Sequence, residues 1–143
     1  MKKVLKKLCF IAVLLSLFSS CENKITEYEY SIYNSFETIN PYGREVIIDN
    51  VYSLELDENN ILLNKREIGV MSYQDKKTFT VSSSVASVYV IYRYREMNPE
   101  GSPYDMIYLK TKNYNLGENI TEIKLGYDNI ISEDEFYNLI NNN

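Results

Sequence analysis

Polar and apolar residues alternate with a period of two through most of the chain beyond residue 25. In ITEYEYSIY, residues 25–33, Tyr28, Tyr30 and Ile32 fall on one face, with acidic or small residues on the other. Such alternation is typical of a β-strand with one buried face. Similar stretches recur at residues 44–50, 51–57, 61–63, 67–73, 77–82, 88–95, 104–111 and 120–125. The pattern therefore predicts a mainly β protein.

Turn-forming residues separate these stretches. Asn40-Pro41-Tyr42-Gly43 places Pro at the second and Gly at the fourth position of a β-turn. Turn formers also gather at residues 57–60, 74–76 and 98–101. The turns at 74–76 and 98–101 predict that the strands flanking each of them pair as a hairpin.

The period changes near the end of the chain, where one short helix is expected at residues 133–140. Ser132 and Glu135 have the spacing of a capping box, in which each side chain bonds to a backbone amide at the helix start. Ile131 and Phe136 stand at the positions of a hydrophobic staple. The apolar face of the helix is expected to consist of Phe136, Leu139 and Ile140.

Seven to nine short strands with frequent turns predict an antiparallel β-sandwich that is immunoglobulin-like in size and strand spacing. The expected single domain covers residues 25–143. The Cys–Trp–Cys signature of antibody domains is missing, so the analogy is one of architecture and carries no function. A helix packed on a more open sheet is the alternative arrangement.

The first twenty residues have the layout of a secretory signal peptide. Four lysines, Lys2, Lys3, Lys6 and Lys7, precede an apolar stretch at residues 8–18. This stretch is too short for a permanent membrane span, which requires ~20 residues.

The end of the apolar stretch resembles the lipobox of bacterial lipoproteins. Ser19, Ser20 and Cys21 match the two small residues and the cysteine of that motif, whereas Phe18 replaces its usual leucine, which stands one place earlier as Leu17. The resemblance implies removal of residues 1–20, a diacylglycerol on the Cys21 sulfur, and a short tether at residues 21–24. It implies a lipid-anchored protein of the cell envelope, expected at the outer membrane, with its periplasmic or surface-facing side left open. A free thiol at Cys21 and a conventional secreted protein are the alternatives.

Composition narrows the classes of function. Loss of the four lysines changes the formal net charge from −5 to −9, which disfavours a nucleic-acid partner. The chain has no histidine, and lipid would block Cys21, so histidine-dependent nucleophilic catalysis is excluded and no catalytic residue is assigned. Calcium at the 57–60 turn is conceivable, but such turns also form for backbone reasons alone. We therefore expect no metal site and no cofactor.

Tyrosine is the most prominent aromatic residue, with 14 copies. Those at strand spacing, such as Tyr30 and Tyr92, are expected to fill the core. A candidate binding surface consists of residues in the opposite phase, namely Tyr33, Tyr73, Tyr89, Arg93 and Arg95. The alternative for the two arginines is that their stems cover a second face of the sheet.

These observations predict a lipid-anchored envelope protein with a non-catalytic binding or structural β-sandwich module. Its partners would be the membrane, through the lipid on Cys21, and another envelope protein. The alternative is a small acidic inhibitor or immunity-type lipoprotein that binds a basic, envelope-acting enzyme.

Overall fold

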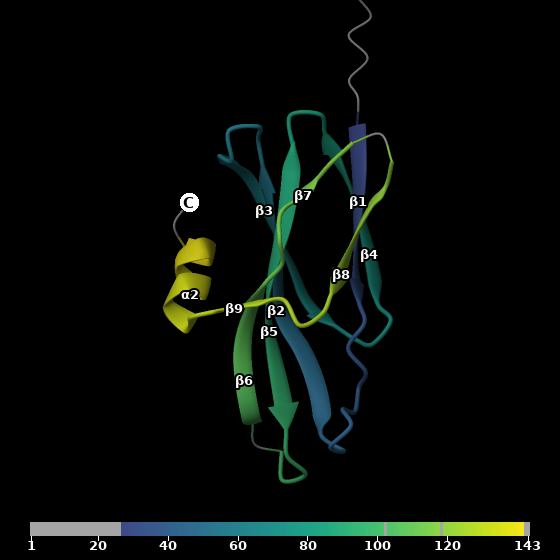
Figure 1. The fold of residues 1–143 in the computed structure, drawn as a ribbon, viewed down its shortest axis with the longest axis vertical. Helices are drawn as coiled ribbons and strands as arrows, with labels where there is room; N and C mark the ends of the chain where they lie inside the picture. Colours follow the sequence, from purple (N-terminus) through teal and green to yellow (C-terminus); the bar gives the residue numbers. More distant parts are fainter. Residues whose placement is uncertain (1–26, 102, 118, 142–143) are drawn as a thin grey trace, which may run out of the picture.

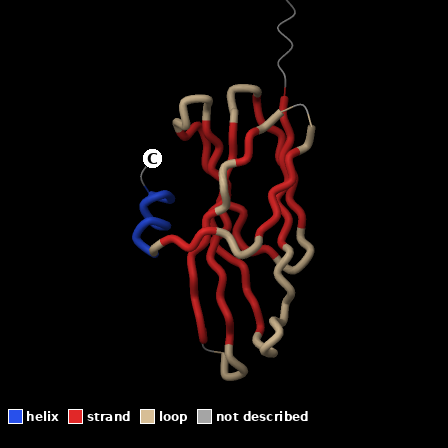
Figure 2. Tube along the Cα trace, in the orientation of Figure 1, coloured by secondary structure: helices blue, strands red, loops and turns tan. Residues whose placement is uncertain are grey.

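Two β-sheets pack face to face, and one helix lies beside the larger sheet (Figure 1, Figure 2). The structure is a computed structural model that describes residues 27–101, 103–117 and 119–141. The predicted signal peptide, Cys21 and the tether lie outside the described residues. The elements are β1 (Glu27–Asn34), β2 (Glu45–Leu56), β3 (Leu62–Met71), β4 (Lys76–Ser82), β5 (Ser87–Met97), β6 (Pro103–Lys110), β7 (Tyr114–Asn115), β8 (Thr121–Leu125), β9 (Asn129–Ile131) and α2 (Glu133–Asn141). The mainly β prediction and the single C-terminal helix are confirmed.

The smaller sheet has the order β4-β1-β8, and the larger has the order β3-β2-β5-β6-β9 with β7 beside β5. β1 and β8 run parallel, from Tyr30 opposite Thr121 to Asn34 opposite Leu125. The prediction of an entirely antiparallel sandwich is therefore wrong for this pair. The chain reaches β8 only after passing through the larger sheet, so no tight turn forces the two strands to run in opposite directions.

β2 is one strand of 12 residues, not the two strands that the sequence predicts. A β-bulge joins its halves: Asn50 has a positive φ of 47°, and the register with β5 shifts between Asp49 and Tyr52. The extra residue moves all later side chains to the opposite face. Ile48 and Val51 consequently both point into the core between the sheets, while Tyr52 contacts the layer that contains α2.

The predicted hairpin around residues 74–76 is wrong, because β3 belongs to the larger sheet and β4 to the smaller one. Gln74, with φ of 65°, allows the chain to cross between the sheets. Asn34 fixes this crossing: its side-chain nitrogen donates to the carbonyl of Met71 at 2.8 Å, and its backbone carbonyl accepts from Gln74 at 3.0 Å. Each strand buries its apolar face against the opposite sheet, which a two-stranded hairpin alone would leave exposed.

The turns at residues 40–43 and 98–101 form as predicted. The Gly43 amide donates to the Asn40 carbonyl at 2.9 Å, and the Gly101 amide donates to the Asn98 carbonyl at 2.9 Å. The second of these turns joins β5 to β6 in the predicted hairpin. Both turns lie at the end of the sandwich opposite to the start of β1 (Figure 1).

The larger sheet is the middle of three layers. Its inner face packs on the smaller sheet, and the shared core includes Tyr30, Ile32, Val90, Tyr92 and Tyr94. Its outer face packs on α2 through a second cluster that consists of Leu54, Leu56, Tyr89, Ile91, Tyr108 and Phe136. The Ser132 hydroxyl accepts from the Glu135 amide at 3.1 Å, which confirms the predicted helix cap.

A buried polar network lies between the sheets. Tyr30 donates to the Glu55 carboxylate at 2.8 Å and lies 2.8 Å from the Ser53 hydroxyl. Glu55 is only 2% exposed and also accepts from Arg66 at 2.5 Å and from Asn64 at 2.9 Å. Burial raises the pKa of Tyr30 well above its ordinary value, so the hydroxyl stays protonated and continues to donate. These bonds compensate for the loss of hydration of a buried carboxylate.

We expect Arg66→Ala to lower the free energy of unfolding by about 1–3 kcal/mol, because it removes a charged donor from a buried acceptor. Urea denaturation followed by circular dichroism measures the change. Lys76→Ala is the matched control, since its 2.6 Å pair with Glu122 is about half exposed, and such pairs contribute about 0–1 kcal/mol. Equal effects of the two substitutions would contradict a stabilising role for the Arg66–Glu55 pair.

Candidate functional site

The candidate site lies on the outer face of the larger sheet, the face turned away from the smaller sheet. α2 covers one half of this face, where it packs on β2, β5 and β6. The other half, nearer to the 98–101 turn, extends beyond α2 (Figure 1). The site therefore has two parts with different chemistry.

The first part is the arginine pair, which consists of Arg93 and Arg95 on β5, held by Asp49 of β2. Arg93 donates to both carboxylate oxygens of Asp49, at 2.7 and 3.1 Å, and Arg95 donates to one of them. The Asp49 side chain is 7% exposed, whereas those of Arg93 and Arg95 are 21% and 24% exposed. Two guanidinium groups on one carboxylate leave a formal charge of about +1 at the surface.

The bulge in β2 explains why Asp49 reaches both arginines. In the register of β2 with β5, Asp49 lies opposite Arg93, and Ile47 lies opposite Arg95. All four side chains thus share the outer face, on which directly opposite residues are close neighbours. The hydrogen bond from Arg93 to Asp49 raises the pKa of Arg93, so this guanidinium remains charged. The Nε of Arg95 is buried and makes no hydrogen bond.

Tyr108 of β6 connects the arginine pair to α2. Its hydroxyl donates to Glu133 at 2.9 Å, and its ring packs 4.8 Å from that of Phe136. Burial, followed by the hydrogen bond to Glu133, raises the pKa of Tyr108 to about 12. The same hydroxyl also raises the pKa of Arg93. Tyr108 thus lies opposite Arg93 in the sheet and contacts α2 through Glu133 and Phe136.

The second part is the α2 groove, a cavity of about 540 Å³ between α2 and the sheet. Its floor is apolar and consists of Leu54, Leu56, Leu62, Tyr89 and Leu139. Its rim is polar and acidic and consists of Asn60, Ser132, Asp134, Glu135 and Asn138. The floor comes mostly from the sheet, while most of the rim comes from the first turns of α2.

The five residues predicted to form a binding surface do not lie together. Arg93 and Arg95 share one face, as expected. Tyr89 is only 7% exposed, so the prediction of a surface ring is wrong there, because α2 covers that half of the sheet. Lys110 also places its Nζ 4.7 Å from the centre of the Tyr89 ring. Only part of Tyr89 reaches solvent, at the floor of the groove.

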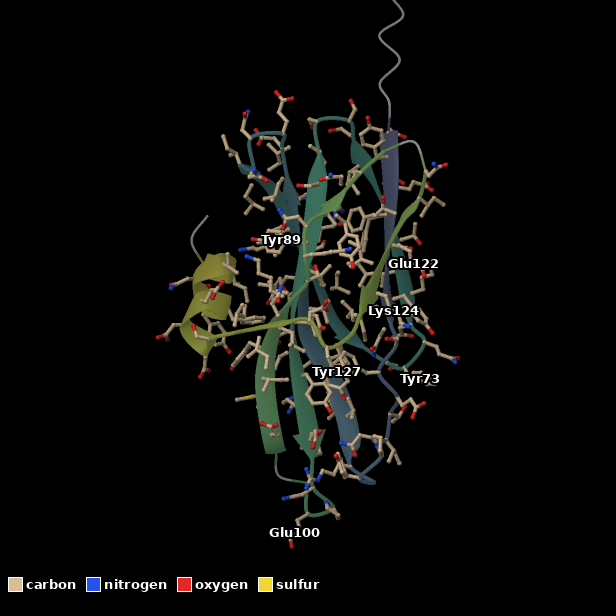
Figure 3. All side chains as sticks on the ribbon, in the orientation of Figure 1. Tyr73, Tyr89, Glu100, Glu122, Lys124 and Tyr127 are labelled. Atoms are coloured by element: carbon tan, nitrogen blue, oxygen red, sulfur yellow. The ribbon has the colours of Figure 1, made fainter. Side chains whose placement is uncertain are left out.

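Tyr33 and Tyr73 lie elsewhere. Tyr33 belongs to β1 of the smaller sheet, where it pairs with Lys76 on one side and Lys124 on the other. Tyr73 is 43% exposed and follows the end of β3. Figure 3 shows Tyr73 well separated from Tyr89, at the side of the molecule away from α2. Tyr33 therefore lies on a different sheet from the arginine pair, whereas Tyr73 lines a cavity together with Ile47, the residue opposite Arg95.

Sequence reasoning missed Asp49 and the groove. The signal for Asp49 was a single acidic residue inside the apolar run VIIDNV, where an unpaired carboxylate would be costly to bury. The signal for the groove was the acidic first turn of α2, formed by Glu133, Asp134 and Glu135. Neither signal identifies its neighbours, which come from distant parts of the sequence.

Other kinds of site are not found in the described part of the chain. Within residues 27–101, 103–117 and 119–141, no three potential metal-binding side chains come together. None of the described helices has both the length and the apolar character needed to cross a bilayer. In comparisons with known proteins, no family model, curated protein or solved structure matches this chain.

We expect Glu133→Gln to lower the pKa of Tyr108 from about 12, but not fully to 10, because burial remains the larger cause of the shift. NMR titration of ring-labelled tyrosine, with Tyr108→Phe for assignment, measures this pKa. Because folding raises the pKa, the wild-type domain should lose stability as the pH rises from about 10 to 12. An unchanged pKa in Glu133→Gln would contradict the hydrogen bond.

Proposed function

We propose that this protein is a lipid-anchored component of the cell envelope whose domain binds another envelope protein. The anchor is Cys21, and the binding surface is the outer face of the larger sheet. The observation that carries the binding proposal is the arginine pair, in which one buried carboxylate fixes two partly exposed guanidinium groups. The role is non-catalytic, in keeping with a chain that has no histidine.

The anchor proposal rests on the basic n-region, the short apolar stretch and the sequence SSC that ends at Cys21. Each buried methylene of a lipid chain contributes ~0.8 kcal/mol, so two or three acyl chains hold a protein firmly. The chain from Cys21 to Glu27 spans at most about 20 Å when extended. The end of the sandwich at which β1 starts would therefore face the membrane, and the arginine pair would lie toward the other end.

The arginine pair suits protein recognition for three reasons. Arginine is enriched at protein interfaces, and its planar group binds carboxylates through two parallel hydrogen bonds. The contacts with Asp49 fix both side chains before binding, which reduces the entropy lost on association. The patch is also positive on a protein whose mature charge is strongly negative, so it would select an acidic spot on the partner.

We also propose that the sandwich is immunoglobulin-like. Nine strands in two facing sheets support this assignment. The parallel β1–β8 pair departs from an entirely antiparallel arrangement. Such an assignment would concern architecture and would add nothing to the functional proposal.

An acidic inhibitor or immunity-type lipoprotein is the second candidate. The observation in its favour is the acidic rim of the α2 groove, together with a mature formal charge of −9 after loss of the four N-terminal lysines. Such a protein would bind a basic enzyme, with an affinity that falls steeply as salt rises.

Cys21→Ala should abolish attachment of the lipid, because it removes the only cysteine that the mature chain would contain. Incorporation of labelled palmitate measures the anchor. The wild-type chain should incorporate the label, and the variant should not. Incorporation of label by Cys21→Ala would overturn the lipid anchor at this residue.

Arg95→Gln should abolish capture of a protein partner from solubilised envelope extract, while the remaining Arg93–Asp49 contact preserves the fold. Lys124→Gln is the control, because it makes the same change in charge at an exposed position on the smaller sheet. Mass spectrometry of the captured proteins compares the two variants. The second candidate, an inhibitor, would be favoured instead if the domain captures a basic enzyme, if high salt abolishes this capture, and if Arg95→Gln does not change it.

A further inference from the structure

We infer that the α2 groove is a docking site for a segment of a protein partner that carries both basic and apolar side chains. This inference rests on the proposed function as a binding module and names the chemistry of what binds. It concerns the half of the outer face that α2 covers, and it does not involve the arginine pair.

The floor of the groove can accept apolar side chains. Leu54 and Leu56 come from β2, Leu62 from β3, Tyr89 from β5 and Leu139 from α2, so four elements converge on one cavity. A volume of about 540 Å³ lies within the range of cavities that bind a few side chains or a small ligand. Leu54, Leu56 and Tyr89 are only 1%, 6% and 7% exposed, so an apolar side chain of a partner would mainly reach Leu62 and Leu139, which are half-buried.

The rim determines the charge of what can bind. Asp134 and Glu135 both line the groove, and the charge of Glu135 contributes to the raised pKa of Tyr89 after the larger effect of burial. Two lysines lie nearby, but neither lines the groove: Lys110 lies over the Tyr89 ring, and Lys65 donates to the carbonyl of Ile140. The carboxylates at the rim thus complement lysine or arginine, and they repel phosphate and other anions.

The walls of the groove are fixed before binding. Ser132 caps α2, as its hydroxyl accepts from Glu135. On the opposite side, the Asp57 carboxylate accepts from the amides of Asn59 and Ile61, both at 2.8 Å, and so orders the turn that contains Asn60. A preformed site of this kind loses little entropy when a flexible segment binds.

The full chain contains no tryptophan, so a peptide with one tryptophan gives a fluorescence signal free of background. The test uses the purified full chain in non-ionic detergent and the blocked peptide acetyl-Lys-Leu-Trp-Leu-Lys-amide. Its acidic counterpart has glutamate in place of both lysines, and detergent without protein provides the blank. Fluorescence anisotropy gives the dissociation constant of each peptide.

We expect the basic peptide to bind about tenfold more tightly than the acidic one, because two carboxylates near the protein surface would attract the lysines and repel the glutamates. The double substitution Asp134→Asn with Glu135→Gln should remove most of this difference. Glu29→Gln with Glu122→Gln makes the same change in charge on the exposed face of the smaller sheet and should have no effect.

Leu62→Lys provides a second variant, which changes no residue of α2 itself. It places a positive charge on the floor and should weaken binding of the basic peptide without weakening that of the acidic one. The inference is overturned if neither peptide binds, if both bind equally, or if the rim substitutions have no effect. If the peptide does not bind but capture of a partner still depends on Arg95, only the proposal for the groove is overturned. If the peptide does not bind and no partner is captured through Arg95, the proposed binding module is overturned as well.

Discussion

The domain depends on the burial of both faces of the larger sheet where β2 and β5 run side by side. The smaller sheet covers one face and α2 covers the other. Six consecutive residues at the start of β5, Ser87 to Tyr92, are buried as a result. Full burial of one large apolar side chain contributes roughly 1.5–3 kcal/mol, so loss of either covering layer would remove several such contributions. The same constraint forces Ser53 and Glu55 of β2 into the interior, where Tyr30 and Arg66 must provide hydrogen bonds.

Much of the fold follows from local patterns in the sequence. Alternation locates the strands, the residues around 40–43 and 98–101 form the expected turns, and Ser132 begins the helix where its cap predicts. The alternation of polar and apolar residues in a strand does not show whether a further layer covers its more polar face. For this reason the sequence predicts an exposed Tyr89, which α2 in fact covers. A bulge such as that at Asn50 reverses the faces within one strand, and only pairing with β5 makes it visible. The hairpin predicted around residues 74–76 does not form, because a turn sequence does not specify which sheet the next strand will join.

The candidate site was only partly accessible from the sequence. The sequence shows that Arg93 and Arg95 lie on the same face of their strand, because residues two positions apart on a strand share a face. Their partner Asp49 lies on a different strand, and the α2 groove requires the packing of α2 on β2 and β3. On the resulting surface a cationic patch and an acidic groove lie on one face, linked by the bond from Tyr108 to Glu133. A surface with charges of both signs can fix the orientation of a partner as well as attract it.

The parallel pairing of β1 with β8 has a consequence for the order in which the chain folds. β1 lies at the centre of the smaller sheet, between β4 and β8, and its second partner comes from near the other end of the chain. Contacts between such distant segments form slowly, because a long loop must close before they add any stability. The smaller sheet is therefore incomplete until residues 121–125 are available. As the chain is synthesised from its N-terminus, the domain would remain open on one side until residues 121–125 have emerged.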